Sequence, residues 1–217
     1  MLCLFYKVEV FILKRKWYIF VFSFLLYYLT IPISVGFATE ILPMDQVIID
    51  STSAINQNSD DAVAYCKRGI AYTFKNQYNL ANNDFNKAIA INPKYTYAYF
   101  CRSAFYSKQN KNDLALSDVN KVIQLDPYYA EAYTLRAASY SLNKQYDLAI
   151  NDCNKAIEIN PKLSNAYGVL GEAYEKKLAY KEAINVYRRL ILNAMLPQDK
   201  SIVDQAKNRI RLLGGDI

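Results

Sequence analysis

The sequence predicts an all-α fold, a solenoid of stacked antiparallel helix hairpins. The first observation is a repeat of 34 residues, marked by one tyrosine and one proline per copy at Tyr72, Tyr106, Tyr140 and Tyr174 and at Pro93, Pro127 and Pro161. The second is the spacing of apolar residues within each copy, which follows the helical period. Since one such unit cannot bury its apolar face alone, the units must stack on one another. Stacked hairpins form a curved groove, a surface suited to binding other chains.

The period divides most of the chain into four copies, 62–95, 96–129, 130–163 and 164–197. A small residue recurs where the two helices of a copy should cross, at Gly69, Ser103, Ala137 and Gly171. An Asn-Pro or Asp-Pro pair closes each of the first three copies, which is typical of a helix end followed by a turn. Each copy is therefore expected to contain two helices.

The third copy carries the repeat motif most fully. Its motif positions are Tyr133, Ala137, Tyr140, Tyr146, Ala149, Ala156 and Pro161. This pattern resembles the tetratricopeptide repeat family, and the resemblance extends from residue 62 to about residue 196. It implies a right-handed α-solenoid of antiparallel helix hairpins that binds a protein or peptide partner in its concave groove.

The family usually has glycine in the turn inside each hairpin, and this chain does not. The corresponding residues are Asn76, Asn110, Lys144 and Leu178. Asparagine tolerates the left-handed backbone conformation, whereas lysine and leucine do so poorly. We therefore expect the turns of the third and fourth copies to be distorted or shifted by a residue.

Residues 1–38 have a different character from the repeats. Basic residues 14–16 precede an uncharged run at 17–31, and small residues follow up to Ala38. This order is that of a secretory signal peptide cleaved after Ala38, while residues 17–38 are also long enough for a retained membrane anchor. We expect an exported protein, periplasmic or secreted if the segment is cleaved and membrane-anchored otherwise.

The charge of the chain does not indicate a nucleic-acid partner. The net charge is +6, but residues 1–38 hold four bases and one acid, which leaves 22 bases and 19 acids, or +3. A nucleic-acid interface needs bases clustered on one face. The recurring bases Lys87, Lys121, Lys155 and Arg189 fall on second helices, the outer wall in the family, and we interpret them as a solvated stripe.

The composition also argues against catalysis. The chain has no histidine, which excludes Ser–His and Cys–His nucleophile pairs and histidine metal ligands. Its six glycines form no phosphate-binding loop, and its cysteines lack metal-ligand spacing. We therefore expect no catalytic residues, no cofactor and no metal site.

The cysteines of the repeats allow two interpretations. Cys66 and Cys101 fall on adjacent first helices at nearly equivalent sites, so they could approach within disulfide range. Alternatively, they are free thiols that line or underlie the groove. Cys153 falls on the apolar stripe of a second helix and is expected in the core.

Two charged positions change together along the chain. Copies one to three carry an arginine and, sixteen residues later, an aspartate: Arg68 and Asp84, Arg102 and Asp118, Arg136 and Asp152. Copy four replaces both at once, with Leu170 and Val186. Sites that change together within one chain are expected to touch, so we predict a structural Arg–Asp pair that bridges the two helices of each of the first three copies.

The ends of the array resemble half-repeats. Residues 39–61 contain a linker and a single helix that aligns with a second helix. Residues 198–217 contain an amphipathic stretch that is expected to form a C-terminal capping helix. Because the first half-repeat lacks its hairpin mate, a homodimer formed through it is one alternative.

The resemblance places the partner on exposed positions of the first helices. The groove residues we select are Cys66, Ile70, Phe74, Tyr97, Phe100, Ser107, Glu131, Thr134, Glu172 and Glu175. Such a groove would be apolar and aromatic at its amino end and acidic at its carboxyl end. The expected ligand is therefore an apolar segment next to Lys or Arg.

The sequence thus predicts a non-catalytic adaptor of a bacterial cell envelope, which binds a peptide or helix of another protein. A self-associating structural protein and an accessory subunit of an envelope enzyme are the alternatives. Membrane contact is expected only through residues 17–38, if they are retained.

Overall fold

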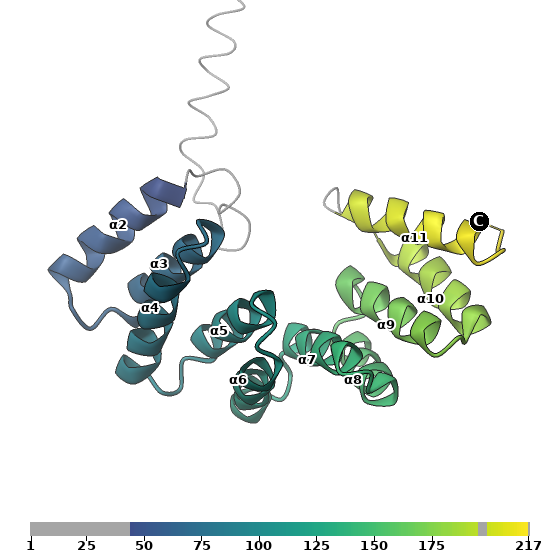
Figure 1. Cartoon of the computed structure of the whole chain (residues 1–217), viewed down its shortest axis with the longest axis horizontal. Helices are drawn as coiled ribbons and strands as arrows, with labels where there is room; N and C mark the ends of the chain where they lie inside the picture. Colours follow the sequence, from purple (N-terminus) through teal and green to yellow (C-terminus); the bar gives the residue numbers. More distant parts are fainter. Residues whose placement is uncertain (1–43, 195–198, 217) are drawn as a thin grey trace, which may run out of the picture. The chain divides into compact units, whose positions relative to one another are not determined.

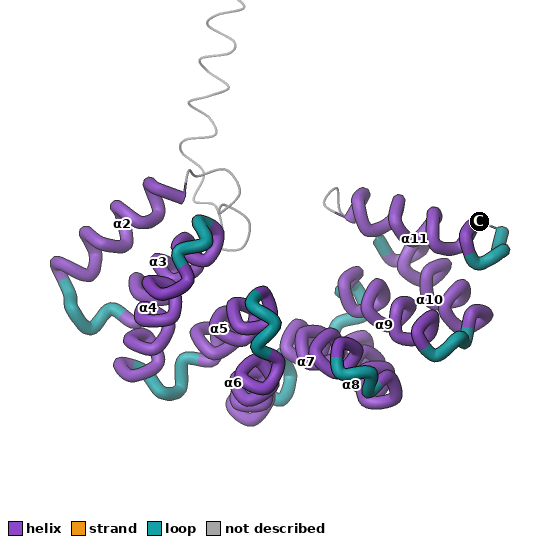
Figure 2. The backbone as a smooth tube through the Cα atoms, viewed as in Figure 1, coloured by secondary structure: helices purple, strands orange, loops and turns teal. Residues whose placement is uncertain are grey.

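The structure, a computed structural model, describes residues 44–194 and 199–216. These residues form helices joined by short turns, without a strand (Figure 2), which confirms the predicted all-α fold. The helices are α2 (Met44–Gln57), α3 (Ala62–Phe74), α4 (Tyr78–Ile91), α5 (Thr96–Lys108), α6 (Asn112–Leu125), α7 (Ala130–Leu142), α8 (Tyr146–Ile159), α9 (Ser164–Lys176), α10 (Tyr180–Asn193) and α11 (Lys200–Leu212).

Each of the four copies is a hairpin of two helices. The first helices are α3, α5, α7 and α9, and the second helices are α4, α6, α8 and α10. The helices follow one another along a curved row (Figure 1), and each packs against the next helix in the chain. The first helices also contact one another in order, so they form a continuous layer. The described part of the chain is therefore a helical repeat solenoid.

Small residues at the helix crossing allow this close packing. A Cβ atom at Gly69 would lie 3.0 Å from the Phe85 ring, and one at Gly171 would lie 2.4 Å from the Tyr187 ring. The alanines of the second helices that face the same crossing are fully buried, at Ala81, Ala115, Ala149 and Ala183. The residue at the crossing is small in every copy because an added methyl group there would push the facing side chain out of the core.

The four turns inside the hairpins are alike, so the expected distortion of the later turns is wrong. Asn76, Asn110, Lys144 and Leu178 all have φ between 58° and 61°. In the fourth copy the turn is closed by the hydrogen bond from Ala179 N–H to the carbonyl of Tyr174 at 2.9 Å, as in the first copy from Gln77 to Tyr72. Packing of the two helices imposes the left-handed turn even on lysine and leucine.

The end of each second helix is fixed by its Asn or Asp. Asn92, Asp126 and Asn160 have extended backbones, and each side-chain oxygen accepts a hydrogen bond from the N–H two residues later, at 3.0–3.1 Å. An Asx turn of this kind competes with continuation of the helix. The proline that follows each Asn or Asp cannot donate a helical hydrogen bond, so the second helix ends there and the chain turns into the next copy.

The two ends of the array are single helices. Helix α2 begins and ends 34 residues before α4, which is the register of a second helix, and it packs against α3. Helix α11 packs against α10 and also touches α9. The predicted signal peptide or anchor, residues 1–38, lies outside the described residues.

Candidate functional site

Each first helix leaves one stripe of side chains uncovered. The stripe falls at i, i+4, i+7 and i+11, which is one face of a helix. We call it the inner stripe, and its residues, all exposed or half-buried, are Val63, Lys67, Ile70 and Phe74; Tyr97, Cys101, Ala104 and Lys108; Glu131, Leu135, Ala138 and Leu142; and Asn165, Val169, Glu172 and Lys176. The remaining faces of these helices are covered by their own second helix and by neighbouring copies.

Over the first three copies the inner stripe is apolar except at Lys67, Lys108 and Glu131. Phe74 and Leu142 are each 60% exposed, and Val63 and Tyr97 are each 44% exposed. Single exposed apolar residues are ordinary, but a row of them along successive helices marks a surface for interaction.

The predicted groove residues fall into three classes. Phe74, Tyr97, Glu131 and Glu172 are exposed, and Ile70, Phe100 and Ser107 are half-buried. Cys66, Thr134 and Glu175 are buried and do not line a groove, which corrects the prediction for these three. For Cys66 and Thr134 the error is one position along the helix, because Lys67 and Leu135 hold the uncovered place instead.

The stripe residues that the sequence reasoning missed include Leu135 and Leu142. The helical period would have located Leu142, because it lies eleven residues after Glu131 and so shares its face. Thr134 lies toward the core instead, where its hydroxyl donates to the carbonyl of Ala130 at 3.3 Å.

Phe100 supports the groove more than it lines it. Its ring packs 5.2 Å from that of Tyr129 and stacks on Tyr97 at 6.4 Å, centroid to centroid. It also packs against the buried cluster of Val119, Val122 and Ala132. Tyr97 is therefore the exposed aromatic of this group, and Phe100 is the residue that holds it in place.

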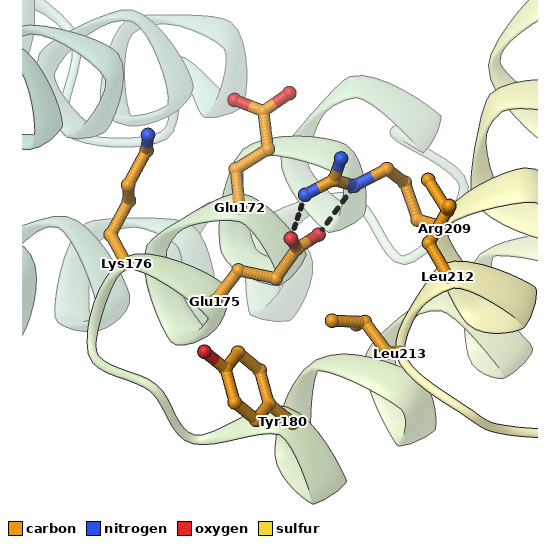
Figure 3. A pocket seen from close by; sticks show the side chains of 7 residues that line it. All are labelled: Glu172, Glu175, Lys176, Tyr180, Arg209, Leu212 and Leu213. Carbon is orange, nitrogen blue, oxygen red and sulfur yellow. Dashed lines mark hydrogen bonds and ion pairs between the residues drawn. The ribbon is translucent and has the colours of Figure 1, made fainter.

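The carboxyl end of the predicted groove is occupied by the capping helix (Figure 3). The Glu175 carboxylate, 8% exposed, accepts from Arg209 of α11, with Nε 2.9 Å from Oε1, and from the Tyr187 hydroxyl at 2.6 Å. A Cβ atom at Gly168 would lie 3.0 Å from Ile202 of α11. Helix α11 thus packs on the part of copy four where the groove was expected to continue.

The charges of the inner stripe therefore differ from the prediction. Glu175 is paired with Arg209 and lies off the inner stripe, whose acids are Glu131 and Glu172. Lys176 of the stripe lines the same cavity as Glu172 (Figure 3). Lys67 and Lys108, in copies one and two, have no carboxylate partner among the described residues. The stripe is mixed in charge, and its carboxyl end is not an acidic site.

The Arg–Asp pairs lie between the helices of the first three copies. In each, the arginine Nε donates to one carboxylate oxygen at 2.7–2.8 Å and Nη2 donates to the other at 2.8–2.9 Å. The partners are Arg68 with Asp84, Arg102 with Asp118 and Arg136 with Asp152. This two-point geometry, with the aspartates buried, gives the pair both strength and direction.

Each arginine makes further contacts that the sequence did not reveal. Nη1 of Arg102 also donates to Asn86 of the preceding second helix, and its guanidinium lies 5.8 Å from the ring centroids of Tyr99 and Tyr106. Hydrogen bonding to Asp84 raises the pKa of the equivalent Arg68. In copy four, Leu170 and Val186 are both buried in one apolar cluster.

The described residues hold no group of three or more Cys, Asp or Glu side chains that could bind a metal ion, and their three cysteines are free thiols. Cys153 is fully buried, and burial raises its pKa to about 12. Within residues 44–194 and 199–216, no helix has the length and apolar character needed to cross a membrane.

Comparison with known proteins agrees with the repeat analysis. Family models described as tetratricopeptide repeat match residues 62–95 and 130–163, which are the first and third copies. No curated protein matches the chain.

Solved structures share its fold at low sequence identity. MamA is 21% identical, with a TM-score of 0.62 over 79% of this chain and 99% of MamA. YrrB, described as a TPR protein with an unusual peptide-binding site, is 19% identical, with a TM-score of 0.59 over 79% and 87%. PilF of Pseudomonas aeruginosa is 14% identical, with a TM-score of 0.67 over 82% and 88%.

The fold and the repeat motif together define the class: an α-helical repeat solenoid built of 34-residue hairpins. The first and third copies are tetratricopeptide repeats, and the described part of the chain shares the fold of known proteins built from such repeats.

Proposed function

We propose that the protein is a non-catalytic adaptor that binds an apolar segment of a partner protein along the inner stripe. The observation that carries this proposal is the uncovered apolar row on the first three copies, in which Phe74 and Leu142 are each 60% exposed. Side chains of this kind contribute most of the free energy of protein association when a partner covers them. The peptide-binding site described for YrrB is consistent with such use of the fold.

The charges define the expected partner further. Lys67 and Lys108 favour an acidic residue beside the apolar segment at the amino end, while Glu131 and Glu172 favour a basic residue further along. Exposed charges of this kind act mainly on the association rate and on salt dependence. The ligand is thus an apolar segment with charges of both signs, and not one with bases alone.

A peptide-display library of random twelve-residue segments tests the inner stripe. Peptides selected on the wild-type chain should bind the Leu142→Ala variant at least tenfold more weakly, because the exposed leucine loses its contact with the ligand. Leu114→Ala on α6 is the matched control, since Leu114 is exposed on a second helix. Selected peptides that bind both variants with wild-type affinity would rule out the inner stripe.

We also propose that the protein is exported. The support is the order of basic, apolar and small residues over positions 14–38. The mature chain should begin at Thr39, and amino-terminal sequencing of the protein from its native cells measures this. A mature chain that still contains residues 17–38 would instead support a retained membrane anchor.

Self-association through α2 is the second candidate. Val47, Asp50 and Ala54 of α2 hold the repeat positions of Ala81, Asp84 and Ala88, which are buried against a first helix in copy one. In α2 the same positions are exposed or half-buried. A second copy of the chain that packs on this face would cover them.

Sedimentation equilibrium over a wide range of protein concentration distinguishes this candidate. If a dimer forms through α2, the mean mass should rise with protein concentration. Asp50→Lys should move that rise to higher concentration, while Asp60→Lys in the following turn should leave it unchanged. A monomer mass at every concentration would remove the candidate and leave the adaptor proposal intact.

A further inference from the structure

Two thiols from neighbouring copies meet beside the inner stripe. Cys66 of α3 is fully buried, and Cys101 of α5 packs against the same apolar cluster. The two helices that carry them are in contact, and the Cys66 thiol lies close enough to Cys101 for that neighbour to raise its pKa. Cys101 is half-buried at a position of the inner stripe, so its thiol has the more accessible place of the two.

We propose that Cys66 and Cys101 form a disulfide on exposure to a disulfide oxidant, and that this bond links copies one and two beside the inner stripe. The site would take a small disulfide such as oxidised glutathione, or the disulfide of an oxidoreductase. It is a modification site that is independent of which partner the groove binds.

The difference in accessibility sets the order of the reaction. The Cys101 thiolate attacks one sulfur of the oxidant, which forms a mixed disulfide and releases the first thiol of the oxidant. The Cys66 sulfur, after loss of its proton, then attacks the Cys101 sulfur, which releases the second thiol. The two protein thiols are oxidised to one disulfide, and the oxidant disulfide is reduced to two thiols that take up the two protons.

The surroundings favour a slow second step. The interaction with Cys101, together with burial, raises the pKa of the Cys66 thiol above its ordinary value, and the burial remains after Cys101 has taken up glutathione. Because the thiolate is the attacking species, the mixed disulfide at Cys101 should persist long enough to be detected. Cys153 is also fully buried but lies in the separate cluster of copies three and four, so it serves as an internal control.

Oxidised glutathione added to the full chain tests the proposal. After blocking of free thiols and digestion with trypsin, mass spectrometry should find the peptide ending at Lys67 linked to the peptide ending at Arg102. The Cys66→Ser variant should instead accumulate glutathione on Cys101, and Cys101→Ser should leave Cys66 unmodified. Cys153 should stay reduced in all three proteins.

The thermal midpoint provides a second measurement. A bond that joins residues 66 and 101 in the folded structure should raise it by on the order of 5–10 °C, and Cys66→Ser should abolish the rise. The proposal is overturned if the wild-type chain holds glutathione at Cys101 without forming the link. It is also overturned if the link forms but lowers the midpoint, because the bond would then require an opened structure.

Discussion

At the scale of single residues, the turn of the fourth copy holds a leucine in a conformation that leucine avoids. Leu178 has φ of 61° and is mostly exposed, so its side chain contributes little burial in return. Left-handed backbone costs an ordinary residue about 1–2 kcal/mol, and asparagine less. The packing of α9 against α10 fixes the path of the turn, and this path requires a positive φ at Leu178.

Replacement of this leucine should therefore stabilise the protein. Leu178→Asn is expected to raise the free energy of unfolding by about 0.5–1 kcal/mol, measured from urea denaturation. The reverse change at the equivalent position, Asn110→Leu, should lower it by a similar amount. An unchanged urea midpoint in both variants would show that the turn relaxes without cost.

The Arg–Asp pair of copy two provides a second prediction at this scale. Asp118 is 5% exposed and is held at two points by Arg102, so Asp118→Ala leaves the half-buried Arg102 guanidinium without its carboxylate partner. The free energy of unfolding should fall by about 3–5 kcal/mol, against less than about 1 kcal/mol for Lys121→Ala in the row of bases on the second helices. Arg102→Leu combined with Asp118→Val, which imitates copy four, should recover much of the loss. Equal and small effects of Asp118→Ala and Lys121→Ala in denaturant melts would contradict this view of the pair.

At the scale of the elements, α11 is held on copy four by the buried apolar residues Ala206 and Ile210 and by one buried carboxylate, that of Glu175. Arg209→Ala should lower the free energy of unfolding by about 1–3 kcal/mol, because Glu175 stays buried with only the Tyr187 hydroxyl as partner. Arg211→Ala, an exposed base on the same helix, is the control and should change it by less than about 0.5 kcal/mol. Chemical denaturation of both variants makes the comparison, and losses of equal size would mean that the Glu175 pair does not hold the cap.

The elements were predictable from the sequence because the repeat compares four copies of one structure. A residue type that recurs at one position of every copy, such as the alanine at Ala81 and Ala115, indicates a packing contact that every copy makes. The groove was predictable only in part, because successive residues of a helix point about 100° apart. An error of one position was therefore enough to select Thr134, which is buried, in place of Leu135. Glu175 was misplaced for another reason: it is neutralised by Arg209 of α11, which lies outside the repeat and which no internal comparison could pair with it.

At the scale of the whole described array, stability is set by contacts between neighbours. Each described helix packs mainly on the next helix in the chain, and the main contacts among the first helices join adjacent copies. In such an array the free energy of unfolding is close to a sum of copy and interface contributions, so parts of it open separately. Helix α2 is the weakest part by this argument, because among the described helices it packs mainly against α3 and leaves Val47 half-buried and Asp50 exposed.

Hydrogen exchange followed by mass spectrometry on the full chain measures this arrangement. Amides of α2 should exchange fastest among the described helices, those of α5 to α8 slowest, and those of α11 at an intermediate rate because the Glu175–Arg209 pair holds it. In the Asp118→Ala variant, exchange should rise most in α5 and α6 and in the helices next to them. Helices α9 to α11 should stay close to the wild-type rate, because their contacts lie on the far side of copy three. A uniform rise over all ten described helices would mean that the array unfolds as one cooperative unit, and the nearest-neighbour account would then be wrong.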